Sequence, residues 1–98
     1  MRKVINGLMY DTEAANVAAS LSYTDRIITS EGASDGPRVE ETLHRTSRDN
    51  WFLHTRRVDG SGWVGEEIRA VDLTHAANFC LRPGVRVVRR WAPRVESA

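Results

Sequence analysis

The sequence predicts a small α+β domain. It has four or five antiparallel strands, a main helix at about residues 13–21 and a short helix at about residues 75–81, in the order β-β-α-β-β-β-α. Three observations support this prediction. A polar segment of turn-forming residues separates two β-prone runs in the middle of the chain. Apolar residues recur at helical spacing after Thr12. A Pro-Gly pair ends the run that follows Thr74, a residue suited to cap a helix.

The first predicted element is a hairpin over Lys3–Tyr10. Its turn is Asn6-Gly7, a pair that readily adopts the positive φ angles of a type I′ turn. Strands this short persist only when they pack on something larger. We therefore expect the hairpin to lie against the rest of the domain.

The main helix is predicted to start at Asp11 or Thr12, either of which suits the N-cap, with Glu13 favourably placed in the first turn. Its apolar residues recur at i, i+3, i+4 and i+7 and are Ala14, Val17, Ala18 and Leu21. After this helix, Ile27-Ile28 is either a short strand or a buried anchor. Residues 30–38 are rich in Ser, Gly, Asp and Pro and are expected to form a mobile loop.

The central element is predicted to be a hairpin of Val39–Thr46 and Trp51–Arg57, joined by the polar segment Ser47–Asn50. With those four residues as the loop, opposite charges fall in cross-strand positions, which favours the pairing. The expected pairs are Thr46 with Trp51, Leu43 with His54, Glu41 with Arg56, and Glu40 with Arg57.

Ile68–Leu73 is predicted to be a further strand, followed by the short helix His75–Leu81. The segment Val85–Trp91 suits either a last strand or a helical turn, and the sequence leaves both open. The tail from about residue 92 is expected to be frayed. The whole chain, residues 1–98, is predicted to form a single domain.

Composition is that of an ordinary globular domain, with 41% hydrophobic and 28% charged residues. No apolar run approaches the roughly 18 residues that a spanning helix needs, and the N-terminus lacks the apolar core of a signal peptide. The single cysteine, Cys80, suits a reducing compartment. We therefore expect a cytoplasmic protein that does not enter the membrane.

Charge is unevenly distributed, although the net charge is only +1. Five arginines and no acid lie between Arg82 and Arg94. If these guanidiniums share one face, they suit nucleic-acid phosphates or an acidic protein surface. A third interpretation is a solvated edge strand, which charged residues protect from aggregation.

Three segments resemble small proteins of bacterial mobile elements such as phages and plasmids. They are V-I-N-G-L-M-Y-D-T-E-A-A at the start, E-E-T-L-H-R-T-x-x-x-N-W-F-L-H in the centre, and I-x-x-V-D-L-T near the end. The chain departs from this group at His44, where tyrosine is usual, and at residues 55–62, where a glycine-rich segment is usual. Some small mobile-element proteins of this kind are anti-CRISPR inhibitors. The resemblance implies an antagonist of host defence, such as an inhibitor of a Cas effector, or an accessory interaction protein.

No catalytic motif or cofactor motif was found in the sequence, so we expect a binding protein rather than an enzyme. His44 and His54 fall diagonally on the predicted hairpin, but no Cys or further carboxylate has ligand spacing with them, so no metal is expected. The expected partner is a host protein or nucleoprotein complex, with nucleic acid and a homodimer left open. The candidate partner-binding residues are Arg56, Arg57, Trp63, Arg82, Arg86, Arg89, Arg90 and Trp91.

Overall fold

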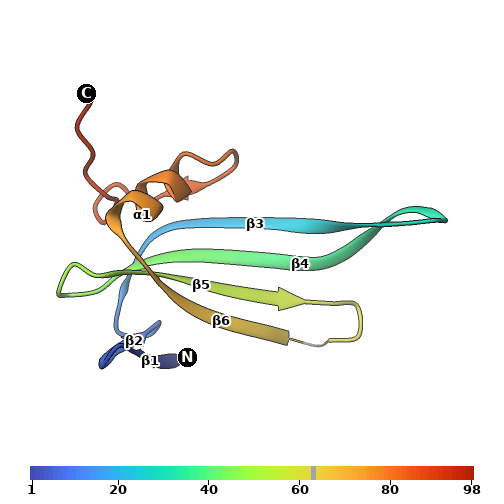
Figure 1. Ribbon diagram of the computed structural model, residues 1–98, viewed down its shortest axis with the longest axis horizontal. Coiled ribbons are helices and arrows are strands. Elements are labelled where there is room, and N and C mark those ends of the chain that lie inside the picture. Colours follow the sequence, from blue (N-terminus) through green and yellow to red (C-terminus); the bar gives the residue numbers. More distant parts are fainter. Residues whose placement is uncertain (63) are drawn as a thin grey trace.

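The chain folds into a predominantly β structure, which the computed structural model describes over residues 1–62 and 64–98 (Figure 1). Within these residues the strands form two sheets, β1–β2 by itself and a five-stranded sheet in the order β6-β5-β4-β3-β7, with antiparallel neighbours throughout. The elements are β1 (Arg2–Ile5), β2 (Leu8–Asp11), β3 (Asn16–Thr29), β4 (Gly32–Arg45), β5 (Trp51–Val58), β6 (Val64–Val71), α1 (Leu73–Cys80) and β7 (Arg86–Val87).

The predicted α+β class is wrong, because the predicted main helix is a turn followed, from Asn16, by the first part of β3. Asp11 does begin a helical turn, since its side chain accepts a hydrogen bond from the Glu13 N–H (2.9 Å) and its carbonyl accepts one from the Ala15 N–H (3.1 Å). The turn then stops. The residues that follow also alternate with period two, and their Ser and Thr residues are poor helix formers. Pairing with β4 along most of their length decides in favour of the strand.

The predicted loop at residues 30–38 is a tight turn followed by the first part of β4. A β-bulge accommodates its Gly36-Pro37 pair. Thr24 faces Arg38 and Arg26 faces Asp35, so β4 has one residue more than β3 between these two pairs. Proline has no N–H to donate, so such a bulge is where a strand tolerates it. Because β5 accompanies β4 only as far as Arg38, residues 25–37 form a two-stranded arm, which projects from the body in Figure 1. The mobility of this segment stays a prediction.

The predicted register of the central hairpin is off by one residue. Arg45 faces Trp51, so the loop spans residues 46–50. Thr46 belongs to this loop because its N–H donates to the Asn50 carbonyl (2.8 Å) and its Oγ1 accepts from the Asn50 N–H (3.0 Å). The shift replaces the expected pairs: Leu43 faces Leu53, Thr42 faces His54, Glu41 faces Thr55, and Glu40 faces Arg56.

Each face of the sheet has its own apolar core. On one face α1 contributes Ala76 and Phe79 to a cluster with Leu43, Trp51 and Leu53. On the other face the β1–β2 hairpin, with its turn at Asn6-Gly7, covers a smaller cluster of Tyr10, Phe52 and Ile68. The strands are covered on both faces near the body and uncovered in the arm (Figure 1).

After β6 the chain continues with α1, β7 and a turn. α1 begins two residues earlier than predicted because Asp72, not Thr74, is its N-cap and accepts the His75 N–H (2.8 Å). The segment 85–91 combines both alternatives left open by the sequence. β7 pairs with β3, and a turn follows in which the Trp91 N–H donates to the Val88 carbonyl (3.0 Å). Residues 93–98 have no regular structure.

Candidate functional site

The predicted partner-binding residues do not form one patch. Arg56 and Arg57 are consecutive in β5, so they point to opposite faces of the sheet. The Arg56 Nε lies 4.0 Å from a carboxylate oxygen of Glu66. Arg57 lines a hollow on the other face together with Glu67 and Arg69. Trp63 lies outside the described residues.

Arg82 is engaged within the molecule. Its Nη1 donates to Glu41 Oε2 at 2.9 Å, and its guanidinium lies 5.8 Å from the centre of the Tyr23 ring and 5.7 Å from that of Phe79. The Glu41 side chain is only 14% exposed, so this carboxylate relies on Arg82 for its charge partner. Arg82 thus connects the end of α1 to the sheet.

Trp91 was predicted as a partner-binding residue, but it is half-buried and packs against the cluster under α1. The Arg90 guanidinium lies 5.2 Å from the centre of its ring. Such a contact shields the indole further and holds the arginine near the body.

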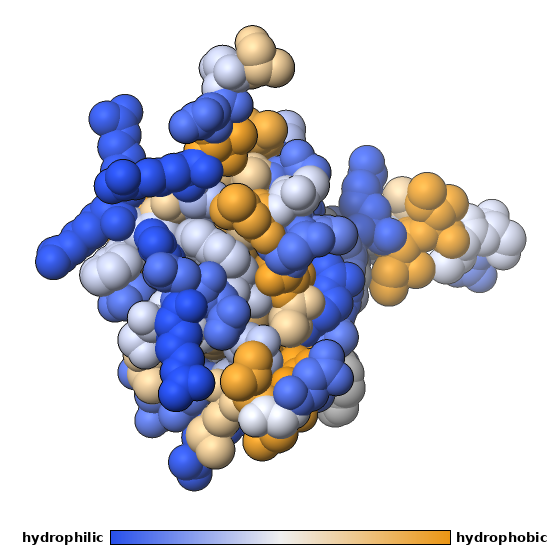
Figure 2. Space-filling model, turned by 60° about the vertical axis from the view of Figure 1, so that its left-hand side comes forward, coloured by the Kyte–Doolittle hydropathy of each residue, from blue (hydrophilic) through white to orange (hydrophobic). Residues whose placement is uncertain are grey.

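Four arginines of the C-terminal segment remain available to a partner. We call them the arginine segment: Arg86, Arg89, Arg90 and Arg94. All four are exposed, and none forms an ion pair with any carboxylate in the part of the chain that the structure describes. Hydrophilic side chains dominate much of the surface shown in Figure 2.

Each end of the arginine segment adjoins a hollow of the surface. Arg86 lines one of about 400 Å³ beside the base of the arm, together with Glu41 and the Arg38–Glu40 ion pair (3.6 Å). Arg94 lines another of about 430 Å³, whose wall includes Arg45 and Trp51. Arg45 is already paired with Asp49 at 2.8 Å. The free positive charge therefore comes from the segment itself.

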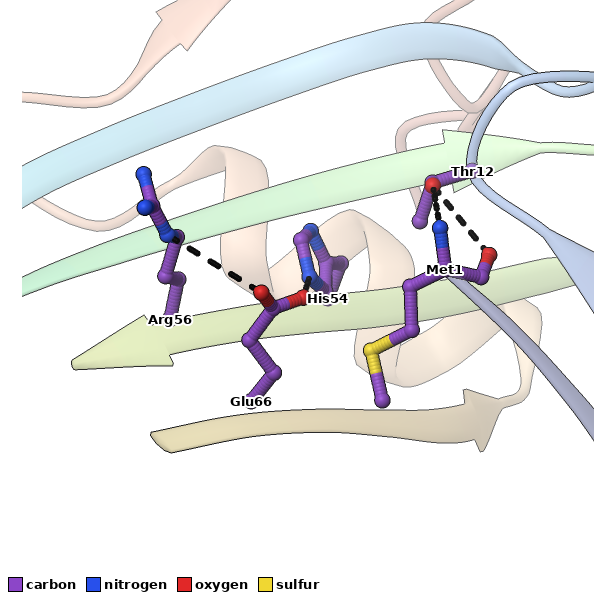
Figure 3. A network of polar contacts seen from close by, with 5 residues as sticks. All are labelled: Met1, Thr12, His54, Arg56 and Glu66. Atoms are coloured by element: carbon purple, nitrogen blue, oxygen red, sulfur yellow. Dashed lines mark hydrogen bonds and ion pairs between the residues drawn. The ribbon is translucent and has the colours of Figure 1, made fainter. Parts of the chain in front are cut away.

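The two histidines of the central hairpin lie near each other, with ring centres 6.3 Å apart. His54 Nε2 is hydrogen-bonded to Glu66 Oε2 at 2.9 Å, and this bond lowers the pKa of Glu66 (Figure 3). His44 is buried and stacks on Phe52 at 4.7 Å. Burial, with a smaller contribution from the charge of His54, lowers the pKa of His44 to about 4.

Neither the histidines nor the cysteine forms a reactive cluster. Over the described residues, no three His, Cys, Asp or Glu side chains are grouped so that they could hold a metal ion. Burial raises the pKa of Cys80, so its side chain stays in the thiol form, which is less reactive than the thiolate.

One surface feature was not predicted. Ile27 and Ile28 lie near the tip of the arm, and 46% and 84% of their surfaces are exposed. Of the two alternatives for Ile27-Ile28, the strand is confirmed, since both lie in β3, and the buried anchor is wrong. Their exposure on a hairpin was not predicted from the sequence.

Comparisons with protein-family models, curated proteins and solved structures find no match to this chain. Over the described residues, none of the helical structure has the length and apolar character required to cross a bilayer.

Proposed function

We propose that this chain is a non-enzymatic binding protein that attaches to a host defence complex through its arginine segment and inhibits it by steric occlusion. The observation that supports the proposal is the presence of four exposed arginines without a carboxylate partner among the described residues. The resemblance to mobile-element proteins implies the class of target, a CRISPR–Cas effector. The chain would thus act as an anti-CRISPR protein.

The segment is held in place before any partner binds. β7 pairs with Ala19 and Ser20 of β3, and the Val88 N–H donates to the Ala18 carbonyl at 2.8 Å. Trp91 packs against the core just beyond. A preorganised surface loses little conformational entropy on binding, and clustered arginines accelerate encounter with an acidic surface.

Occlusion requires affinity and bulk, and both are compatible with this molecule. Its extents are 47 × 34 × 21 Å, so it can cover a sizeable part of a partner's surface. Arginine also suits both surfaces that a nucleoprotein complex offers, because its planar guanidinium pairs with carboxylates and with phosphates.

The experiment measures target-DNA binding by purified Cas effector–guide complexes of several types, with and without the purified chain. We expect the chain to abolish DNA binding by at least one of them. The Arg89→Glu/Arg90→Glu double variant should inhibit at least tenfold less well. Arg2→Glu/Arg48→Glu is the matched control, since it changes the net charge equally at exposed arginines elsewhere. Absence of inhibition of every effector, or full inhibition by the double variant, would contradict the proposal.

The second candidate is a nucleic-acid-binding accessory protein of a mobile element. The observation that favours it is the exposure of the whole arginine segment without a carboxylate partner among the described residues, because guanidiniums in this state suit the phosphates of a nucleic-acid strand. Four phosphate contacts predict a roughly hundredfold loss of affinity for DNA between 50 and 200 mM salt. Steep salt dependence without inhibition of any effector would favour this candidate.

A further inference from the structure

The arm leaves a long strand edge unpaired. β7 covers β3 only at Ala19 and Ser20, and pairing of β4 with β5 ends at Arg38. Among the described residues, the outer edge of β3 from Leu21 to Thr29 therefore has no neighbouring strand. A two-stranded ribbon is marginally stable by itself in water, and a free edge is a template for a further strand.

This edge is also regular and weakly protected. The irregularity of the arm lies in β4 at Gly36-Pro37, so β3 runs without interruption past it. β3 contains neither lysine nor proline, the residues that commonly protect edges, and Arg26 and Asp25 are its only charged residues. The edge strand on the other side of the sheet, β6, carries three charges in eight residues.

Apolar surface lies along the same arm. Ile28 is 84% exposed, and Ile27 is 46% exposed although it lies against Gly36. Figure 2 shows hydrophobic side chains gathered on the projecting part of the molecule. Because Ile27 and Ile28 are consecutive in β3, they lie on opposite faces of the arm, so each face presents one exposed isoleucine near the open strand edge that a second chain could cover.

We propose that two copies of this chain form a two-fold symmetric dimer in which the free β3 edges pair in antiparallel orientation. Two identical edges related by a two-fold axis perpendicular to the sheet run antiparallel, so the same patch serves both copies. Antiparallel pairing over Leu21–Thr29 brings the tip of each arm to the base of the other. The two five-stranded sheets then become continuous.

Charge complementarity supports a second copy as the occupant. The arm carries Asp25, Glu31 and Asp35 against a single arginine, a net charge of −2, whereas the rest of the chain carries +3. At the base of the arm, Arg86 and Arg38 line a hollow together with Glu40 and Glu41. Arg38 lies 3.6 Å from Glu40, and Glu41 is paired with Arg82, so Arg86 is the guanidinium of this hollow that can meet an acid of another copy. Antiparallel pairing places Glu31 of each tip next to this hollow of the other copy. Nucleic acid would instead be repelled by the acidic arm.

One pair of like charges opposes this arrangement. The middle of the paired edge is Asp25, so the two Asp25 carboxylates lie near the two-fold axis. Removing this charge should tighten the dimer, whereas a dimer formed through another surface would be indifferent to it.

Sedimentation equilibrium of the full chain, with the chain itself as the probe, tests the dimer. We expect a wild-type dimer, a dissociation constant raised at least tenfold in Glu31→Arg and in Arg86→Glu, and recovery to within about threefold of wild type in the double charge exchange. Asp25→Asn should lower the constant, and Glu13→Arg, an exposed acid away from the arm, should leave it unchanged. A wild-type monomer at millimolar concentration, a double variant no tighter than the single variants, or a weaker Asp25→Asn dimer would each overturn the proposal. Inhibition of an effector is scored separately, so either proposal can fail without the other.

Discussion

At the scale of single residues, His44 illustrates how packing changes a side chain that the sequence presents as an ordinary polar strand residue. It is 4% exposed and stacks on Phe52, and its Nδ1 has no hydrogen-bond partner among the described residues. Burial lowers its pKa from 6.5 to about 4, so the folded protein binds this proton less readily than the unfolded chain. The stability that neutral His44 contributes is therefore fully present above about pH 6.5, and it is lost progressively as the pH falls toward 4.

We expect the free energy of unfolding to fall by about 2 kcal/mol between pH 7 and pH 5 through His44 alone. His44→Phe keeps the stacked ring and removes the titration, so urea unfolding at the two pH values should give nearly equal stabilities for this variant. His75→Gln, at an exposed histidine, is the control and should retain the loss. An equal pH dependence in wild type and His44→Phe would show that His44 is not responsible.

Arg82 and Arg89 should differ in their effect on stability, because Arg82 is bound within the molecule and Arg89 is exposed. Arg82→Ala removes the 2.9 Å bond to Glu41 and the contacts with two rings, and it leaves a mostly buried carboxylate unpaired. We expect a loss of about 1 kcal/mol, since Arg82 itself is partly exposed. Arg89→Ala should change stability by less than about 0.5 kcal/mol. Thermal or urea unfolding of both variants measures the difference, and equal effects would contradict this assignment.

At the scale of elements, β3 shows where local sequence signals are insufficient. Residues 14–21 satisfy helical spacing, and Asp11 does begin a helical turn. Val17, Ala19, Leu21 and Tyr23 satisfy strand alternation as well. The choice depends on pairing with β4, a contact between distant residues that no short window contains. The Asn6-Gly7 hairpin was predictable because its turn chemistry is local.

The start of α1 provides a test of capping. Asp72 accepts the His75 N–H at 2.8 Å, and the hydrogen bonds from His75 lower the pKa of this carboxyl. Asp72→Ala removes this N-cap hydrogen bond and should therefore destabilise the fold. Thr74→Ala, at the cap expected from the sequence, should cost clearly less. Equilibrium unfolding at pH 7 compares the two, and a larger effect at Thr74 would contradict the observed cap.

The arm depends on the close approach of its strands at Gly36. A Cβ there would lie 2.9 Å from the Asp25 carbonyl oxygen and 3.0 Å from Ile27 Cγ1, so backbone must shift to admit it. Gly36→Ala should destabilise the arm by about 1–3 kcal/mol, seen as faster amide hydrogen exchange in residues 25–37. Gly60→Ala has open space around it and is the control. Unchanged exchange in Gly36→Ala would show that the contact is dispensable.

At the scale of the whole molecule, the sheet has a body covered on both faces and an arm that lacks such cover (Figure 1). The charges follow the same division, with excess negative charge on the arm and excess positive charge on the rest. Dimerisation through the arms would leave Arg89, Arg90 and Arg94 of both copies exposed. Two such segments on one particle would strengthen attachment to a partner that offers two sites.

The arginine segment was predictable as a charge pattern, but its availability was not. Arg82 and Trp91 were predicted as partner-binding residues together with Arg86, Arg89 and Arg90, because spacing along the chain does not show which side chains turn inward. Glu41, far away in sequence, determines that Arg82 is engaged. The exposed arm was not predicted, because its Ser, Gly, Asp and Pro residues are typical of a loop. Only the pairing of β3 with β4 shows that they form a hairpin.

The most direct test of the binding account uses cells with an active CRISPR–Cas system and a plasmid that this system targets. Expression of the wild-type chain should restore transformation by the targeted plasmid to near that of an untargeted one. Arg89→Glu/Arg90→Glu, expressed and folded equally, should leave transformation blocked. Equal restoration by both proteins would contradict the role of the arginine segment, and no restoration in cells carrying any of the tested effector types would contradict inhibition itself.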